Sequence, residues 1–354
     1  MEVVFERGDI IKQSQVEKPT TLSLVFSFRN EEAVLSELIR RTRAVLEKEK
    51  QKGVIAAYEL IFVNDASTDR SGEILLKERG NHSDIRVLNT SRCFGVAACI
   101  LAGMEHSRGE AVIYMDADLQ DPPECIPQLL EAWKTQQVDV VHTVRKSRRG
   151  ESQSKIFLTK MGYRILNSFS TIAIPMEAGD FKLLSRRMVN HLLQLRENRP
   201  FIRGLICWIG FKQTFVYYER KARHGGKSKF PVLGWKVLSN FFGSALISFS
   251  SFPLKMASFL GLLAILFDFV FLVHVCFEKI SGRAIPGWTA IMIAVLFAGG
   301  VQLLCLGIIG IYLDSIHEQS KQRPNFIVES TFGFPETVLR QHSSYLPTEE
   351  SIKS

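Results

Sequence analysis

The sequence predicts an α/β fold, an open and mostly parallel sheet with helices on both faces, followed by a hairpin of two membrane-spanning helices. Two observations lead to this class. From Leu22 onward, short apolar runs typical of buried strands alternate with segments whose apolar residues recur at the helical period. Farther along, residues 256–277 and 289–313 form apolar runs long enough to cross a hydrocarbon core of about 30 Å. A wholly soluble protein is therefore excluded.

The predicted elements follow one another in a regular order. The strands are LSLVFSF, YELIFV, IRVL, AVIYM and VDVVHTV, which begin at residues 22, 58, 85, 111 and 138. The helices between them include GVAACILAGMEH and IPQLLEAW, and Asn30 stands where it can cap a helix with apolar positions from Val34 to Leu46. Because strands and helices alternate, neighbouring strands are expected to be parallel.

Charge is distributed unevenly along the chain. The 354 residues include 44 Lys or Arg and 36 Asp or Glu, a net charge of +8. Residues 141–229 alone contain 19 Lys or Arg and 5 Asp or Glu, a net charge of +14. Aromatic residues are sparse in this basic region, and it leads into the predicted hairpin. An anionic lipid head group is therefore the expected partner, and nucleic acid is not.

The six cysteines are scattered, without a CxxC pair or nearby histidines at metal-ligand spacing. This pattern argues against a zinc site or a disulfide framework and favours small, buried thiols in a reducing compartment. The first twenty residues lack the apolar core and cleavage site of a signal peptide. We therefore expect the polar part of the chain to stay on the cytoplasmic side of the membrane.

The predicted regions differ in composition: an N-terminal extension (1–20), an α/β domain (21–229), an interfacial amphipathic region (230–253), two transmembrane helices (254–315) and a cytoplasmic tail (316–354). In the amphipathic region, Trp235, Leu238 and Phe242 share one helical face. This pattern suits a helix lying at the membrane surface, and an ordinary core helix is the alternative.

The distribution of basic residues predicts the orientation of the hairpin. Lysines cluster just before the first span, and Lys321 and Arg323 follow the second. The positive-inside rule then places both termini in the cytoplasm of a multi-pass inner-membrane protein. Asp268 lies within the first span, where an acid favours helix pairing or a contact between copies in a homo-oligomer.

Polar residues follow the first, second and fourth predicted strands. In parallel sheets ligands bind beyond the carboxyl ends of the strands, so these residues are candidates for a site. They are Ser27, Arg29, Glu31, Asn64, Asp65, Asp116, Asp118 and Gln120. Asp65 is a candidate hydrogen-bond partner of a nucleotide base or ribose. A turn with Ser67 or Asp69 as helix cap equally explains NDASTD, and both interpretations can hold.

The segment Asp116-Ala117-Asp118, continued by Gln120, predicts a metal site. Two carboxylates and an amide oxygen are ligands that suit Mg²⁺ or Mn²⁺. A divalent ion there would bridge a diphosphate and stabilise the charge on it as it leaves. By contrast, the first strand is followed by no GxGxxG, and GGKS lacks the glycine that a P-loop requires five residues earlier.

The basic region supplies candidates for binding phosphate. In RHGGKSK, Arg223 and Lys229 flank a glycine pair and could clamp phosphate oxygens, and attraction to anionic lipid is the alternative. Arg145, Arg149 and Lys155 belong to the same basic region, for which an anionic lipid head group is the expected partner. Asp180 is a lone acid among cations. Two interpretations are open for it: it forms a salt bridge, or it orients an acceptor.

These motifs together resemble family 2 glycosyltransferases, in the branch of polyprenyl-phosphate glycosyltransferases related to dolichol-phosphate mannose synthase. The resemblance covers about residues 21–328. It is carried in order by SFRNEE, FVNDASTD, SRCFGVAACILAGM, DADLQDPPE, AGDFKLL, RPFIRGLICWIGF, RHGGKSK and KQRPNFIV, with the two-helix tail. This chain departs from the family pattern at Ser27, Arg29 and Ala66, where Pro, Tyr and Gly are frequent.

The resemblance implies a GT-A fold that binds a nucleotide-diphosphate sugar. By motif, Ser27, Arg29, Glu31 and Asp65 would contact the nucleoside. The metal and diphosphate would be held by Asp116, Asp118 and Gln120, and the phosphates clamped by Arg223 and Lys229.

The implied reaction is inverting transfer of a sugar from a UDP- or GDP-sugar to a polyprenyl phosphate, such as undecaprenyl phosphate, at the cytoplasmic membrane face. Such a lipid-linked sugar would serve modification of cell-envelope glycans. A lipid phosphate is already anionic and needs no strong general base, and in this reaction Arg145, Arg149 and Lys155 would position it. The catalytic candidates are Asp118, in the metal set, and Asp180, which would orient the acceptor or act as a secondary base. The alternatives are a processive polysaccharide synthase with the same donor site and a non-enzymatic membrane scaffold.

Overall fold

The computed structural model describes residues 20–145, 178–195, 197–198, 200–218, 252–281 and 287–334. The predicted N-terminal extension and amphipathic region lie outside these residues, apart from their last one or two positions. Eight strands form one sheet in the order β7-β5-β6-β4-β1-β2-β3-β8. Their bounds are β1 Thr20–Phe28, β2 Ile55–Asn64, β3 Ile85–Thr90, β4 Ala111–Asp116, β5 Val140–Arg145, β6 Ala178–Ser185, β7 Gln213–Tyr218 and β8 Val328–Phe332.

The sheet is mixed, with its central part parallel. The five predicted strands are confirmed as β1 to β5, and β1 pairs in parallel with both β2 and β4. Parallel pairing also joins β2 to β3 and β5 to β7. The sequence did not indicate the other three strands, β6, β7 and β8; of these, β6 and β8 run antiparallel to their neighbours. The predicted α/β class with a mostly parallel sheet is therefore confirmed.

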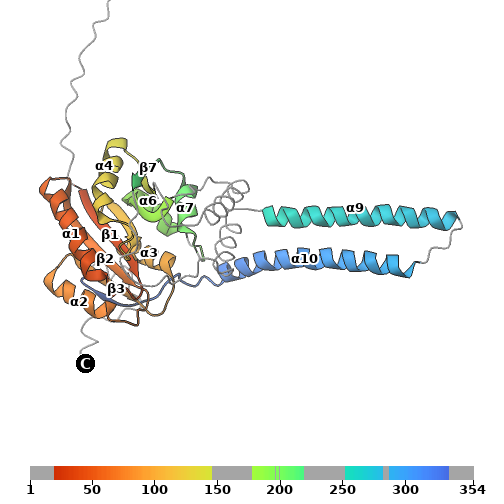
Figure 1. Ribbon diagram of the computed structural model, residues 1–354, viewed down its shortest axis with the longest axis horizontal. Coiled ribbons are helices and arrows are strands. Elements are labelled where there is room, and N and C mark those ends of the chain that lie inside the picture. The colour runs from red at the N-terminus through yellow and green to blue at the C-terminus, as the bar shows by residue number, and fades with distance from the viewer. Residues whose placement is uncertain are drawn as a thin grey trace, which may run out of the picture.

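Helices cover both faces of the sheet (Figure 1). Their bounds are α1 Leu35–Gln51, α2 Ser71–Asn81, α3 Val96–Glu105, the 3₁₀ turn η1 Pro123–Cys125, α4 Ile126–Gln136, α6 Arg186–Gln194, α7 Ile202–Ile209, α9 Phe252–Ile280 and α10 Trp288–Ser320. One face packs against α1, α2 and α4 through residues such as Leu38 and Leu129. The opposite face packs against α3, α6 and α7 through residues such as Met104, Met188 and Leu205.

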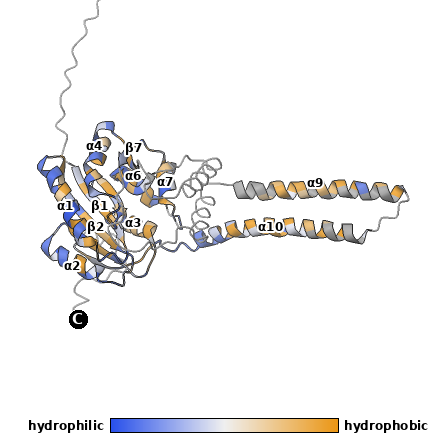
Figure 2. Cartoon of the chain, viewed as in Figure 1, coloured by the Kyte–Doolittle hydropathy of each residue, from blue (hydrophilic) through white to orange (hydrophobic). Residues whose placement is uncertain are grey.

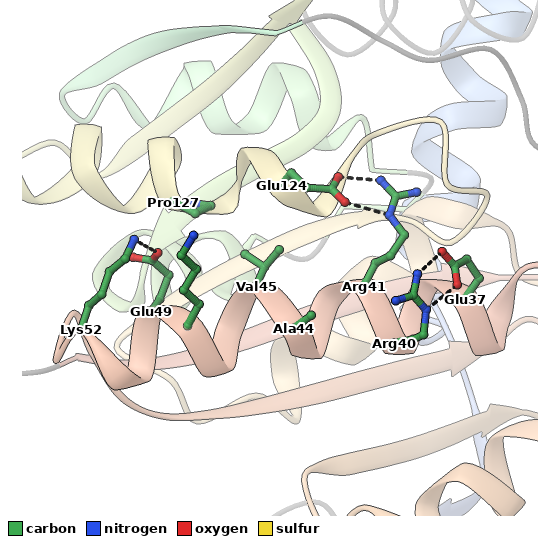
Figure 3. A pocket seen from close by; sticks show the side chains of 10 residues that line it. Glu37, Arg40, Arg41, Ala44, Val45, Glu49, Lys52, Glu124 and Pro127 are labelled. Carbon is green, nitrogen blue, oxygen red and sulfur yellow. Dashed lines mark hydrogen bonds and ion pairs between the residues drawn. The ribbon is translucent and has the colours of Figure 1, made fainter.

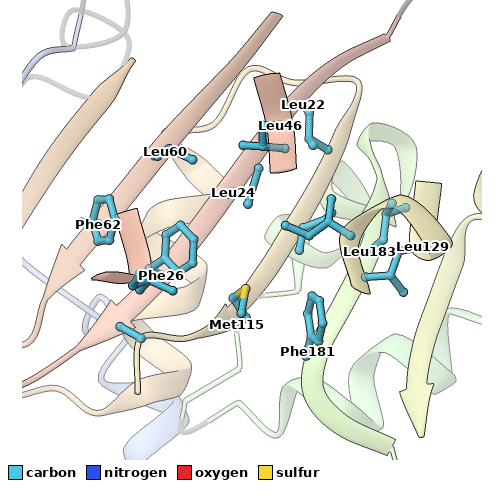
Figure 4. Close-up of a cluster of buried hydrophobic side chains, with 14 of the residues drawn as sticks. Leu22, Leu24, Phe26, Leu46, Leu60, Phe62, Met115, Leu129, Phe181 and Leu183 are labelled. Atoms are coloured by element: carbon cyan, nitrogen blue, oxygen red, sulfur yellow. The ribbon is translucent and has the colours of Figure 1, made fainter. Parts of the chain in front are cut away.

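Each face has its own apolar core, because successive strand residues point to opposite sides. On the α1 and α4 face, Phe26 and Phe62 stack with ring centroids 4.8 Å apart (Figure 4). On the other face, α3 lies so close to β1 that a Cβ added at Gly103 would stand 2.3 Å from Cγ1 of Val25. This close approach packs the C-terminal part of α3 against β1 and β2.

The prediction that Asn30 caps α1 is wrong. The N-cap position is Val34, without a side-chain hydrogen bond. Asn30 has a φ of 56°, and its Oδ1 accepts a 2.7 Å hydrogen bond from the backbone N–H of Thr68. Its side chain therefore binds the loop after β2, where Thr68 is 38 residues away in the sequence and adjacent in space.

Both predicted apolar runs are helical. They fall within α9 and α10, which lie side by side and extend away from the sheet (Figure 1). Phe267 and Phe297 contact each other with ring centroids 5.4 Å apart, and Sγ of Cys305 donates to the carbonyl of Ala257 at 3.3 Å. Among the described helices, one segment, Phe297–Ser320, has the length and mean hydropathy, 1.7, of a membrane span.

The chain returns to the sheet after α10. Residues 316–354 were predicted to form a cytoplasmic tail, and within them Val328–Phe332 forms β8 and pairs with β3. The physical reason is that β3 would otherwise be an exposed edge strand with an unpaired row of backbone N–H and C=O groups. The sheet is thus built from segments on both sides of the two long helices.

Candidate functional site

The strand register brings several predicted site residues to one face and one edge. Ser27 on β1 lies opposite Asp116 on β4, and on its other side Ser27 neighbours Val63 of β2. Ser27 and Asp116 follow Val25 and Tyr114 at two-residue spacing, so they share the face covered by α3. Asp65 comes directly after β2 at the same edge. The predicted convergence of polar groups is therefore confirmed for these three strands.

The antiparallel strand β6 adds Asp180 to this edge. Tyr114 of β4 pairs with Lys182 of β6. If this register is continued two residues forward on β4 and two residues back on β6, Asp116 and Asp180 stand at neighbouring positions on the same face. The charges of both carboxylates raise the pKa of the Tyr114 phenol, after the larger effect of burial. Two motifs that are distant in the sequence thus meet at one place.

Asp180 forms an ion pair with Arg203 of α7. Its Oδ1 accepts a 2.6 Å hydrogen bond from Nε, and its Oδ2 contacts Nη2 of the same guanidinium. This bidentate arrangement holds the carboxylate in one orientation. The salt-bridge interpretation of Asp180 is therefore correct, and it is compatible with a role in orienting an acceptor.

Asp65 organises the turn before α3. Its Oδ1 accepts a 2.7 Å hydrogen bond from the backbone N–H of Phe94, and Oδ2 accepts from the N–H of Gly95 at 3.1 Å. Sγ of Cys93 donates to Oδ2 at 3.1 Å, while Nη1 of Arg29 donates to the same sulfur at 2.8 Å. Arg29 and Asp65, predicted from separate motifs, are thus joined through a thiol.

The exposed position of Cys93 corrects the expectation of uniformly buried thiols. Among the described cysteines, Cys99 is buried, Cys93 is exposed, and the other three are intermediate. Partial desolvation and the neighbouring Asp65 carboxylate raise the pKa of the Cys93 thiol. The thiol therefore stays protonated and acts as a hydrogen-bond donor to Asp65.

The remaining predicted residues differ in how far the structure describes them. The backbone N–H of Glu31 donates to Oγ of Ser71 at 2.9 Å, so the loop after β1 is fixed to the start of α2. Arg145 ends β5 and pairs with Tyr218 of β7. Arg149, Lys155, Arg223 and Lys229 lie outside the described residues.

A hollow elsewhere on the surface has no connection with this edge. It has a volume of about 600 Å³ and lies between α1 and the η1–α4 segment, on the opposite face of the sheet (Figure 3). Six of its seven charged side chains, all except Lys48, pair with one another: Arg41 with Glu124 at 2.6 Å, Arg40 with Glu37 at 2.7 Å, and Lys52 with Glu49 at 2.6 Å. These mutual pairs leave little charge for recognising a ligand.

Known proteins that are similar to this chain in sequence are named as glycosyltransferases. The family "Glycosyl transferase family 2" matches residues 23–193. An "uncharacterized glycosyltransferase YkcC" of Bacillus subtilis is 38% identical over 312 residues, which are 88% of this chain and 94% of that protein. The chain belongs to glycosyl transferase family 2. It is also 33% identical to the bactoprenol glucosyl transferase of Shigella phage SfV, over 87% of this chain and 98% of the relative.

Solved structures give a more distant similarity. The glucosyl-3-phosphoglycerate synthase of Mycobacterium tuberculosis, solved with Mn²⁺, UDP-glucose and phosphoglyceric acid, has a TM-score of 0.44 and 17% identity, over 65% of this chain and 79% of that one. The mannosyltransferase PcManGT of Pyrobaculum calidifontis, solved with GDP-mannose and Mn²⁺, has a TM-score of 0.42 and 13% identity, over 86% and 76%.

The oxygen atoms of the predicted metal motif are ligands of the kind that suit a hard divalent cation. Asp116 and Asp118 are half-buried, and Oδ1 of Asp118 accepts a 3.1 Å hydrogen bond from the backbone N–H of Gln120. Leu119, which lies between Asp118 and Gln120, has a φ of 56°, so the backbone turns tightly at this point. Over the described residues, no three His, Cys, Asp or Glu side chains cluster as metal ligands. Two carboxylates are nevertheless a ligand set that fits Mg²⁺, which proteins usually hold through one or two carboxylates together with substrate phosphates and water.

Beneath the carboxylates lies a buried polar row that sequence reasoning missed. Tyr114, Lys182 and His142 stand at one level of β4, β6 and β5. In the described part of the chain, the Tyr114 hydroxyl, Lys182 Nζ and His142 Nδ1 are buried without a hydrogen-bond partner. Burial lowers the pKa of Lys182 to about 8, although Asp180 acts in the opposite direction. A lysine inside a strand of mostly apolar residues was the available signal.

A second missed residue is Asp121, which follows the predicted metal motif. It is 1% exposed, and its Oδ1 accepts a hydrogen bond from the hydroxyl of Tyr218 at the end of β7. This contact ties the loop after β4 to the edge strand of the sheet. The signal in the sequence was a third acid in DADLQD, after Asp116 and Asp118.

Proposed function

We propose that this glycosyltransferase moves a sugar from a nucleotide-diphosphate sugar to a polyprenyl phosphate of the undecaprenyl type, with inversion, at the cytoplasmic face of the membrane. The observation that carries the proposal is the meeting of Asp116 and Asp180 on β4 and β6, beside Ser27 and the turn held by Asp65. The names of relatives such as the bactoprenol glucosyl transferase of Shigella phage SfV support the same acceptor class. The product would supply a sugar for cell-envelope glycans.

The donor would bind along the edge from β2 to β4. Asp65, Arg29, Ser27 and Glu31 are the proposed nucleoside contacts. Asp116, Asp118 and Gln120 would hold Mg²⁺ or Mn²⁺, whose chemistry when bound is to offset negative charge on the departing diphosphate. The proposed phosphate clamp, Arg223 and Lys229, would approach from the basic region.

The acceptor would bind on the side of β6 and α7. The Asp180–Arg203 pair is part-buried next to Asp116, which suits an acceptor phosphate that must approach the sugar in one orientation. Arg145, Arg149 and Lys155 are the proposed cations for that phosphate. Since a phosphate monoester is anionic at neutral pH, Asp180 would orient the acceptor more than remove a proton from it.

The long helices would anchor the enzyme in the membrane as a two-helix hairpin with both termini in the cytoplasm. Apolar residues run along both helices, and the end of α10 nearest the sheet is hydrophilic (Figure 2). Large apolar side chains such as Leu262 on α9 and Leu303 on α10 are 65% and 71% exposed. Surfaces that are apolar on all sides suit a lipid environment. A homo-oligomer through these helices belongs to the same proposal.

The test uses the purified full chain in detergent or nanodiscs, with polyprenyl phosphate, Mn²⁺ and a panel of UDP- and GDP-sugars. The expected product is a lipid carrying one sugar, identified by mass, and its formation should stop with EDTA. A lipid-free polymer would instead indicate a processive synthase. If titration with Mn²⁺ and each nucleotide gave no binding, a non-enzymatic scaffold would replace the proposal.

A further inference from the structure

A chain of amide hydrogen bonds links the strand after α10 to the loop after β2. Nδ2 of Asn89 on β3 donates to Oγ of Ser330 on β8 at 2.9 Å. Nδ2 of Asn64, at the end of β2, donates to Oδ1 of Asn89 at 3.0 Å. Oδ1 of Asn64 in turn accepts a 2.9 Å hydrogen bond from the backbone N–H of Ser67. Residues 241 positions apart, Asn89 and Ser330, are thus joined directly.

At Ser67, this series of hydrogen bonds supports a strained turn. Ala66, between Asp65 and Ser67, has a φ of 51°, a left-handed conformation that costs energy for any residue with a Cβ. The hydrogen bond from Ser67 to Asn64 closes the turn around Ala66, and Thr68 is held by Asn30 on the other side. A strained turn persists only where its surroundings determine it strongly. The two asparagines provide that support next to Asp65.

At its other end, at Ser330 on β8, the series of hydrogen bonds lies close to the end of α10 in the sequence. Only residues 321–327 separate the end of α10 from β8. Nδ2 of Asn198 donates to the carbonyl of Glu318 at 2.6 Å, and its backbone N–H donates to Oε1 of Gln319 at 2.8 Å. Nδ2 of Asn325 donates to the carbonyl of Glu197 at 2.9 Å. The end of α10 is therefore fastened to the sheet domain at the point where β8 begins.

We propose that Ser330 and Asn89 are positioning residues for the donor site: through Asn64 they hold the turn at Ala66 so that Asp65 faces the nucleotide. The segment that follows the proposed membrane anchor thereby completes the donor edge of the enzyme. This inference rests on the proposed function, because Asp65 is there the nucleoside contact.

The test compares Ser330→Ala and Asn89→Ala with a matched control, Thr331→Ala, in the full chain. Thr331 is the next residue of β8 and points to the other face of the sheet. Each lost hydrogen bond should raise the KM for the donor by about three- to tenfold, with kcat changed less than about twofold. Amide hydrogen exchange in residues 64–70 should become faster in both variants and stay unchanged in Thr331→Ala.

A rescue experiment separates positioning from general destabilisation. Ala66→Gly removes the strain of the left-handed turn, so the same Ser330→Ala change should then raise KM by less than about twofold. The proposal is overturned if exchange in 64–70 and donor KM stay at wild-type values in Ser330→Ala and Asn89→Ala, or if Ala66→Gly gives no relief. If the wild type transfers no sugar, the proposed function fails, and the exchange measurement still decides whether the hydrogen-bond chain holds the turn.

Discussion

Tyr114 on β4 and Lys182 on β6 face each other across an antiparallel pair, with the lysine Nζ 5.9 Å from the centre of the phenol ring. Both side chains are fully buried, and they stand directly below Asp116 and Asp180. A buried lysine without a hydrogen-bond partner is costly, because the charged form loses its hydration. Its position under two carboxylates gives a physical reason for its presence, namely that its charge offsets theirs.

Replacing Lys182 should therefore change stability and activity in opposite directions. Folding lowers the pKa of Lys182 from 10.5 to about 8. Between pH 10.5 and 8 the unfolded chain therefore binds more protons than the folded chain, and the stability of the fold decreases as the pH falls. At pH 7 the whole destabilisation that results from burying Lys182 is present, on the order of 3 kcal/mol. Lys182→Met should raise the midpoint of thermal unfolding while lowering kcat by about ten- to a hundredfold. A variant that is more stable and equally active would show that the lysine has no role in the site.

His142, in the same buried row, predicts a stability change in acid. Burial, with a smaller effect of Lys182, lowers its pKa from 6.5 to about 4 in the folded protein. The unfolded chain therefore binds the extra proton first, and stability falls as pH drops from about 6.5 toward 4, by up to about 1.4 kcal/mol per pH unit. The unfolding midpoint should drop less steeply over this range in His142→Leu than in the wild type. Equal pH slopes for the two proteins would contradict the assignment.

Asp118 is expected to be required for metal-dependent transfer. Asp118→Asn removes one carboxylate from a set of two and leaves the hydrogen bond to the Gln120 N–H possible through the amide oxygen. Turnover with Mn²⁺ should fall by at least about a hundredfold without a change in thermal stability. Glu131→Gln, on the exposed side of α4 and the opposite face of the sheet, is the matched control and should keep full activity. Near-normal turnover of Asp118→Asn would remove it from the metal site.

The sequence anticipated the parts of this site that depend on local pattern. Ser27, Asp65 and Asp116 follow buried strands, and the rule for carboxyl ends of parallel strands was enough to place them together. The neighbouring positions of Asp116 and Asp180 could not be anticipated, since they depend on an antiparallel register between strands far apart in the chain. The same holds for Ser330 and Asn89, because long-range pairing leaves no periodic signal in either segment.

The Asp180–Arg203 pair gives the sharpest test of the acceptor side. Asp180→Asn should lower kcat by at least about a hundredfold with little change in donor KM. The carboxylate stands next to Asp116 but lies on β6, on the proposed acceptor side, and not along the edge from β2 to β4 where the nucleotide is proposed to bind. A structural salt bridge alone would be restored by exchanging the charges in the double variant Asp180→Arg and Arg203→Asp. We expect the exchanged pair to regain thermal stability but not turnover, since the negative charge would then lie on α7, away from the sugar. Recovery of kcat in the exchanged variant would reduce Asp180 to a purely structural role.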